Sequence, residues 1–192
     1  EVSAADVWEY NAATAQLQRV FRASIGIPLG VGVADFDGDG RLDFFVSQYN
    51  FGSRPRLYRN LGNNQFSLVP QTAFPVRVGR TLGYAWGDYD NDGDLDLFVP
   101  NKDGVPARNS LLRNQGDGTF ALVTDGPIAT EGGWSFGAAW GDYDNDGFLD
   151  LHVANEIAPS EGAEQPTPRF LYHNNGDGTF TKVLSGSPAT DN

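Results

Sequence analysis

Three aspartate-rich segments of nearly the same sequence constrain the fold of this chain more than any other feature. In chain order they read ADFDGDGRLDFFVSQ, AWGDYDNDGDLDLFVPN and AWGDYDNDGFLDLHVAN. Their first aspartates are Asp35, Asp88 and Asp142, which lie 53 and 54 residues apart. A repeat of about this length is typical of stacked supersecondary units. The sequence therefore predicts a repeat protein and not one irregular core.

Each segment fits the pattern D-x-D-x-D-G-x-x-D, with carboxylates at positions 1, 3, 5 and 9. These carboxylates are Asp35, Asp37, Asp39, Asp43, Asp88, Asp90, Asp92, Asp96, Asp142, Asp144, Asp146 and Asp150. Calcium takes roughly 6 to 8 oxygen ligands, which four carboxylates, a backbone carbonyl and a water can supply. Magnesium fits less well, because it prefers an octahedron in which several waters remain. The pattern predicts one Ca²⁺ site in each loop, so three in all.

Two other interpretations of the loops are weaker. An EF-hand needs a glutamate at position 12 and flanking helices, whereas position 12 is Val46, Val99 or Val153 in an apolar run that predicts a strand. A turn without metal gains nothing from repelling carboxylates that occur in triplicate. The glycine at position 6 allows the positive φ that folds such a loop around an ion.

The charge of the chain is concentrated in these loops. The net charge is −12, from 25 acidic and 13 basic residues. Without the twelve loop carboxylates, 13 acids balance 13 bases, so the rest of the surface has no bias that suits nucleic acid or an anionic membrane. We expect neither as a partner, and the sequence has no apolar run of about 18 residues that would insert in a membrane.

A second repeated segment follows each loop: LYRNLGNNQFSLV, LLRNQGDGTFALV and LYHNNGDGTFTKV. Its apolar residues flank a turn rich in asparagine and glycine, which predicts a hairpin. A degenerate fourth copy, WEYNAATAQLQRV, lies near the start. One unit is then strand A, aspartate loop, strand B, a variable loop and the C–D hairpin, which is a propeller blade. The sequence predicts an all-β fold of β-propeller-type blades with four antiparallel strands, in a single repeat domain, 1–192. It comprises a half unit at 7–21 and complete units at 28–70, 80–124 and 134–184.

The segments GDYDNDGDLDLFV and NQGDGTF resemble the FG-GAP and VCBS-type repeats of integrin α-subunit headpieces and of many secreted bacterial proteins. The resemblance covers almost the whole chain and rests on three ordered copies. It implies β-propeller blades that bind calcium in the A–B loop through the twelve aspartates named above. It also implies that the position-7 residues Arg41, Asp94 and Phe148 contribute their backbone carbonyls.

Three complete units and one half unit leave a bare sheet edge or blade face at each end. We expect these ends to be covered by self-association, either head to tail or by strand complementation, or by the rest of a longer propeller.

The sequence shows no nucleophile beside a base, and the two histidines look structural, because His152 matches Phe45 and Phe98 whereas His173 matches Arg59 and Arg113. We expect no catalytic residue and no enzyme activity. The expected function is an extracellular, secreted or cell-surface, calcium-binding structural, adhesion or interaction module. Calcium loops favour the outside of a cell, where weak sites stay filled.

A carbohydrate-binding propeller is the alternative, with glycan or protein ligands held by the variable B–C loops. Trp86 and Trp140 precede their loops at matching positions. Packing between blades is the favoured role for both, and a platform for sugar is the other.

Overall fold

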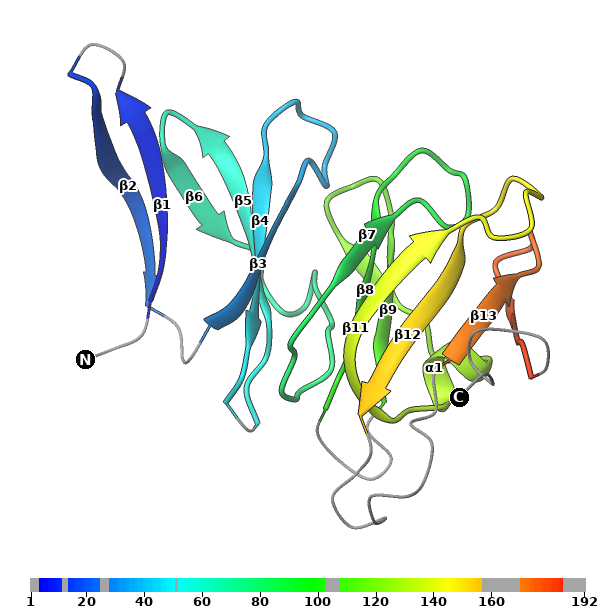
Figure 1. Ribbon diagram of the computed structural model, residues 1–192. Coiled ribbons are helices and arrows are strands. Elements are labelled where there is room, and N and C mark those ends of the chain that lie inside the picture. Colours follow the sequence, from blue (N-terminus) through cyan, green and yellow to red (C-terminus); the bar gives the residue numbers. More distant parts are fainter. Residues whose placement is uncertain are drawn as a thin grey trace.

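The computed structural model describes residues 4–11, 14–24, 28–50, 52–102, 108–156 and 170–184. These residues form three four-stranded antiparallel sheets and one two-stranded sheet, arranged side by side in chain order (Figure 1). The one helix in these ranges is the four-residue α1 (Pro127–Thr130). No helix among the described residues is long and apolar enough to cross a membrane.

Each four-stranded sheet keeps its strands in chain order, as a propeller blade does. Blade 1 consists of β3 (Pro28–Ala34), β4 (Asp43–Gln48), β5 (Arg56–Gly62) and β6 (Gln65–Leu68). Blade 2 consists of β7 (Ala85–Gly87), β8 (Asp96–Val99), β9 (Ser110–Asn114) and β10 (Phe120–Leu122). Blade 3 consists of β11 (Trp134–Gly141), β12 (Asp150–Glu156), β13 (Phe170–Asn174) and β14 (Phe180–Lys182). The predicted fold class is confirmed.

The N-terminal hairpin pairs β1 (Ala4–Asn11) with β2 (Gln16–Ser24). It packs on blade 1 through the ring of Phe21, whose centroid lies 5.5 Å from that of Phe44 and 5.4 Å from that of Tyr58. Val7 packs against the same cluster. The hairpin thus contacts blade 1 from the side on which a preceding blade would lie.

The core lies between successive blades. Successive side chains of a strand point to opposite faces, so Leu97 and Val99 of β8 pack toward blade 1 whereas Phe98 packs toward blade 3. All four residues of β8 are buried, because blades cover both of its faces. This burial explains why the strand reads as a continuous apolar run after its aspartate.

Some core residues come from the segments between the predicted units, at 71–79 and 125–133. Phe74 and Val76 follow β6 and are fully buried between blades 1 and 2. Ile128 and Ala129 of α1 join the core between blades 2 and 3. Short segments rich in proline and polar residues gave no periodicity from which this burial could be predicted.

Strand β7 covers only Ala85–Gly87 and is shorter than β3 and β11, the first strands of the other two blades. The residues before it contact neighbouring blades. The hydroxyl of Tyr84 donates a hydrogen bond of 2.9 Å to the carbonyl oxygen of Val31 in blade 1. A Cβ placed on Gly83 would lie 2.7 Å from the carbonyl oxygen of Phe136 in blade 3.

Candidate metal centres

The three aspartate loops connect the first two strands of each blade and share one backbone geometry. The position-6 glycines have positive φ, as expected: 83° at Gly40, 94° at Gly93 and 91° at Gly147. Position 4 is also left-handed, which we did not predict: φ is 68° at Gly38, 58° at Asn91 and 60° at Asn145. Glycine and asparagine adopt this conformation at low cost. Two of the first six loop residues, at positions 4 and 6, therefore have a left-handed backbone conformation, which turns the chain back on itself.

The position-1 carboxylate closes the loop. In blade 2, Asp88 accepts hydrogen bonds from the backbone N–H groups of Asp92 (3.1 Å) and Gly93 (2.9 Å). Asp35 and Asp142 accept the equivalent two bonds in their own loops. The position-5 carboxylate accepts the N–H of position 7, at 3.0 Å from Asp94 to Asp92. These bonds fix the conformation of the loop backbone.

The position-9 carboxylate is buried and ties the loop to the third strand of the blade. Asp96 is fully buried, and its two oxygens accept the N–H groups of Tyr89 (3.1 Å) and Asn114 (2.8 Å). Asp43 and Asp150 make the equivalent pairs of bonds. Burial raises the pKa of Asp96 to about 7 and that of Asp43 to about 6. Ionising either carboxyl group therefore costs free energy when no cation is nearby.

The position-3 carboxylate carries an oxygen with no partner. Asp90 Oδ2 lies 2.7 Å from Nε of Arg113, and Asp37 Oδ2 lies 2.8 Å from Nε of Arg59. The other oxygen, Oδ1, is shielded from solvent in both aspartates and accepts no hydrogen bond from the protein. A shielded carboxylate oxygen without a donor is costly, and a hard cation would satisfy it. The residues present therefore fit calcium.

In each loop, three carboxylates place one oxygen each within 4.8 Å of the others. The groups are Asp35, Asp37 and Asp39; Asp88, Asp90 and Asp96; and Asp142, Asp144 and Asp150. Asp43, Asp92 and Asp146 lie in the same loops but outside these three groups. Ligation by any of the twelve stays a prediction, as does ligation by the carbonyls of Arg41, Asp94 and Phe148, whose N–H groups bind position 5.

One position in the third strand of each blade faces the loop, and this was not predicted from the sequence. Alignment of the repeats matched Arg59, Arg113 and His173, but did not show that this strand position lies over the position-3 aspartate. The structure places Nδ1 of His173 3.2 Å from Oδ2 of Asp144, where the other two loops have arginine. The signal in the sequence was a polar residue at a fixed distance before each Asn-x-Gly turn.

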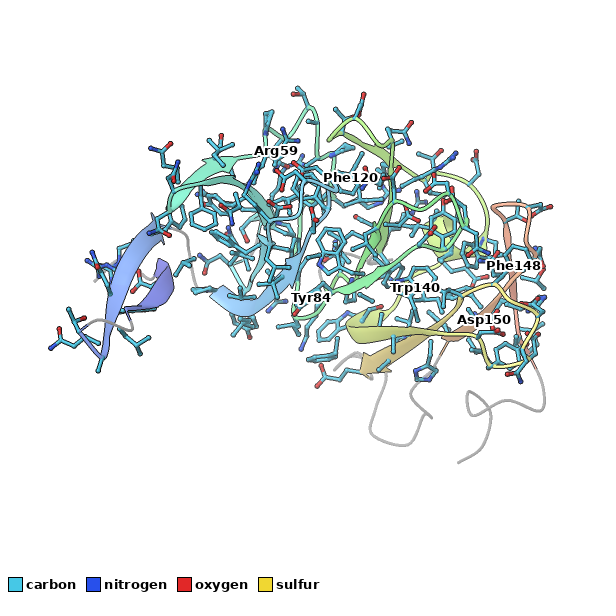
Figure 2. All side chains as sticks on the ribbon, turned by 90° about the horizontal axis from the view of Figure 1, so that it is seen from above. Arg59, Tyr84, Phe120, Trp140, Phe148 and Asp150 are labelled. Atoms are coloured by element: carbon cyan, nitrogen blue, oxygen red, sulfur yellow. The ribbon has the colours of Figure 1, made fainter. Side chains whose placement is uncertain are left out.

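The favoured role of the two repeated tryptophans is confirmed. Trp140 stacks on Tyr89 with ring centroids 6.0 Å apart, and its Nε1–H donates to the carbonyl oxygen of Ala85 at 3.1 Å. Figure 2 shows Trp140 between blades 2 and 3. Trp86 packs in the core between blades 1 and 2, with its ring 6.4 Å from that of Phe120. Both side chains join blades.

Comparison with known proteins agrees with this architecture. The FG-GAP-like repeat family matches residues 35–99 and 101–153. Cartilage acidic protein 1 of Homo sapiens is 26% identical over 172 residues, which cover 81% of this chain and 24% of that protein. The Xenopus tropicalis protein of the same name is 30% identical over 148 residues, covering 73% of this chain and 22% of the relative. The chain thus spans about a quarter of the length of these relatives. With its ordered blades and repeated aspartate loops, the chain belongs to the FG-GAP-like repeat family.

Proposed function

We propose that this chain is a calcium-binding structural and interaction module that works outside the cell. The observation that carries the proposal is the convergence of three carboxylate oxygens within 4.8 Å in each of three loops. Carboxylates at this separation repel one another, and a divalent cation replaces the repulsion with attraction. Millimolar extracellular calcium would keep even weak sites of this kind filled.

The role of the ion in this proposal is mechanical. Asp96 links its loop to β9, and Asn114 at the end of β9 donates a hydrogen bond of 2.7 Å to the carbonyl oxygen of Phe36 in blade 1. An ion that fixes the loop would therefore also fix the contact between blades. Because such an ion binds the folded loop and not the unfolded chain, its binding free energy adds to the stability of the fold.

The test is calcium titration by calorimetry, together with thermal unfolding in calcium and in EGTA. We expect up to three bound ions and a higher melting temperature in calcium. Asp90→Asn removes a position-3 ligand and should lower the number of ions bound by one. Asp94→Asn is the matched control, because it removes the same charge from the same loop at a position assigned only a carbonyl. Equal calcium binding by both variants, or an unchanged melt in EGTA, would contradict the proposal.

The proposed interaction partner is a further blade of the same repeat type, and the end of blade 3 supports this. Position 2 of the loop is Phe36, Tyr89 and Tyr143 in the three blades, with exposures of 1%, 3% and 50%. The first two lie under the following blade, whereas Tyr143 has no following blade among the described residues. The apolar face of a following blade covers Phe36 and Tyr89, and the same kind of face would cover Tyr143.

The opposite end supports the same partner. Val33 occupies the position of Trp86 and Trp140, but 61% of it is exposed. It borders a groove of about 470 Å³ between the N-terminal hairpin and blade 1, which Trp8 also lines. The first two strands of a preceding blade would fill this groove and complete a blade with the hairpin. They could come from a second copy or from the rest of a longer chain, such as the relatives have.

Sedimentation velocity in calcium and in EGTA tests whether a second copy supplies the partner. A larger species in calcium that dissociates when Tyr143→Arg is introduced would support self-association. A monomer in both conditions would rule out a second copy and assign the exposed ends to a longer chain. A glycan site in the B–C loops stays a prediction, because parts of these loops, 103–107 and 157–169, lie outside the described residues.

A further inference from the structure

The third aspartate loop differs from the first two in one residue that faces it. The first two loops have an arginine beside the position-3 aspartate, whereas the third has His173 beside Asp144. We propose that the third loop binds a transition-metal ion of the Zn²⁺ class through Nδ1 of His173 and the carboxylates of Asp144 and Asp146. This inference rests on the proposed function only in that the loops bind divalent cations.

The ligand atoms are already close together. Nδ1 of His173 and one oxygen each of Asp144 and Asp146 all lie within 4.8 Å of one another. Nδ1 is 3.2 Å from Oδ2 of Asp144. Two ligand atoms that each lie about 2.1 Å from a tetrahedral zinc ion are about 3.4 Å apart. The separation of the nitrogen and the oxygen therefore suits one shared ion.

Nδ1 of His173 has carboxylate neighbours but no hydrogen-bond partner. Nδ1 of His173 is shielded from solvent and makes no hydrogen bond. It lies 3.3 Å from Oδ1 of Asp150, but that oxygen accepts the backbone N–H of Asn174 at 2.8 Å. A shielded imidazole nitrogen that faces carboxylates and makes no hydrogen bond is suited to bind a metal ion that the carboxylates also bind.

The arginines of the other loops cannot play this part. A guanidinium group has five N–H donors and no lone pair for a metal, and it stays charged. At 2.8 Å from Asp37 and 2.7 Å from Asp90, it places a fixed positive charge beside the ion site. Imidazole nitrogen suits zinc, copper, nickel and cobalt, whereas carboxylate and carbonyl oxygen suit calcium. The three loops should therefore differ in which ion they prefer.

The chain offers a matched pair of loops for the test. Loop 2 reads GDYDNDGDLDL and loop 3 reads GDYDNDGFLDL, so the two differ at position 7 and in the facing residue. We would titrate the whole chain with Co²⁺, a spectroscopic substitute for zinc, and follow the visible absorption and the heat of binding. Calcium titrations of the same proteins run in parallel.

The native chain should bind one Co²⁺ tightly, with absorption bands that indicate nitrogen ligation. His173→Arg should weaken this binding by more than about tenfold, since loss of an outer-sphere partner alone costs about that much. Arg113→His should create a second cobalt site in loop 2. His152→Phe is the control, because it removes the only other histidine and restores the residue type of Phe45 and Phe98.

The outcomes separate this inference from the proposed function. Cobalt binding that is the same in the native chain and in His173→Arg would overturn the inference, whatever calcium does. If cobalt requires His173 but calcium binds to none of the three loops, the inference holds and the proposed calcium role fails. If neither ion binds, both are wrong.

Discussion

The side-chain amide of Asn174 donates a hydrogen bond of 2.7 Å to the backbone carbonyl oxygen of Tyr89, and so joins β13 of blade 3 to the loop of blade 2. The same amide donates to the carbonyl oxygen of Leu149 in its own loop, at 3.0 Å. Asn114 makes the equivalent bond to Phe36 of blade 1, at 2.7 Å. The aspartate loops of blades 1 and 2 are thus each held by their own blade and by the next one.

We expect Asn174→Ala to lower the free energy of unfolding by about 1 to 3 kcal/mol, because it leaves buried carbonyl oxygens without a donor. Asn60→Ala should cost less. Among the described residues, the amide of Asn60 donates only to the carbonyl oxygen of Leu42 in its own loop, at 3.0 Å and in an exposed place. Urea unfolding in excess calcium compares the two variants. Equal losses would show that the bond between blades contributes nothing measurable.

The glycines five residues before each loop provide a second comparison between a covered and an uncovered blade. A Cβ on Gly83 would lie 2.7 Å from the carbonyl oxygen of Phe136, whereas a Cβ on Gly137 would meet nothing within 4 Å. Gly83→Ala should destabilise the protein by about 1 to 3 kcal/mol through overpacking. Gly137→Ala should be neutral or slightly stabilising. Thermal unfolding of both variants is the measurement. An unchanged melting temperature in Gly83→Ala would contradict the close approach of the blades.

Position 2 of the loops tests which blade faces are covered. Tyr89→Ala should cost about 3 to 5 kcal/mol of unfolding free energy, because the ring is buried between blades 2 and 3. Tyr143→Ala should change the stability of a monomer by less than about 0.5 kcal/mol, since half of the residue is exposed. Denaturant unfolding at low protein concentration measures both. A large loss for Tyr143→Ala would mean that its exposed face is covered in solution.

Features that depend on the repeat itself could be predicted from the sequence. The four-strand order of each blade, the hairpins and the positive φ at Gly40, Gly93 and Gly147 all follow from local patterns that occur three times. Local chemistry decides these features, because turn residues and alternating apolar residues act within a few positions of the chain.

Features that depend on a neighbouring blade could not be predicted in the same way. Phe74 and Ile128 are buried only because another blade lies against them. His173 was classed as structural, since its contact with Asp144 depends on how the third strand lies over the loop. Asp96 was expected to act as a ligand, and the structure shows that it also links Tyr89 to Asn114. A repeat aligned in sequence does not show what lies across its faces.

The metal-free protein should become less stable as the pH rises from about 4 to about 7. The folded-state pKa is about 7 for Asp96 and about 6 for Asp43, both above the unfolded value near 3.9. Between these values the folded chain binds more protons than the unfolded chain, so the free energy of unfolding falls as the pH rises. The lowered pKa values of Asp6, Asp117 and Asp177 act below this window. Melting temperatures in EGTA across the window measure the effect.

The same series in excess calcium is the control. Calcium stabilises the ionised carboxylates, so the decline should disappear or reverse as the loops release protons and bind the ion. A melting temperature that rises with pH in EGTA would contradict the burial of Asp96 and Asp43 as uncompensated carboxyl groups. A decline of the same size with and without calcium would place the titrating groups outside the aspartate loops.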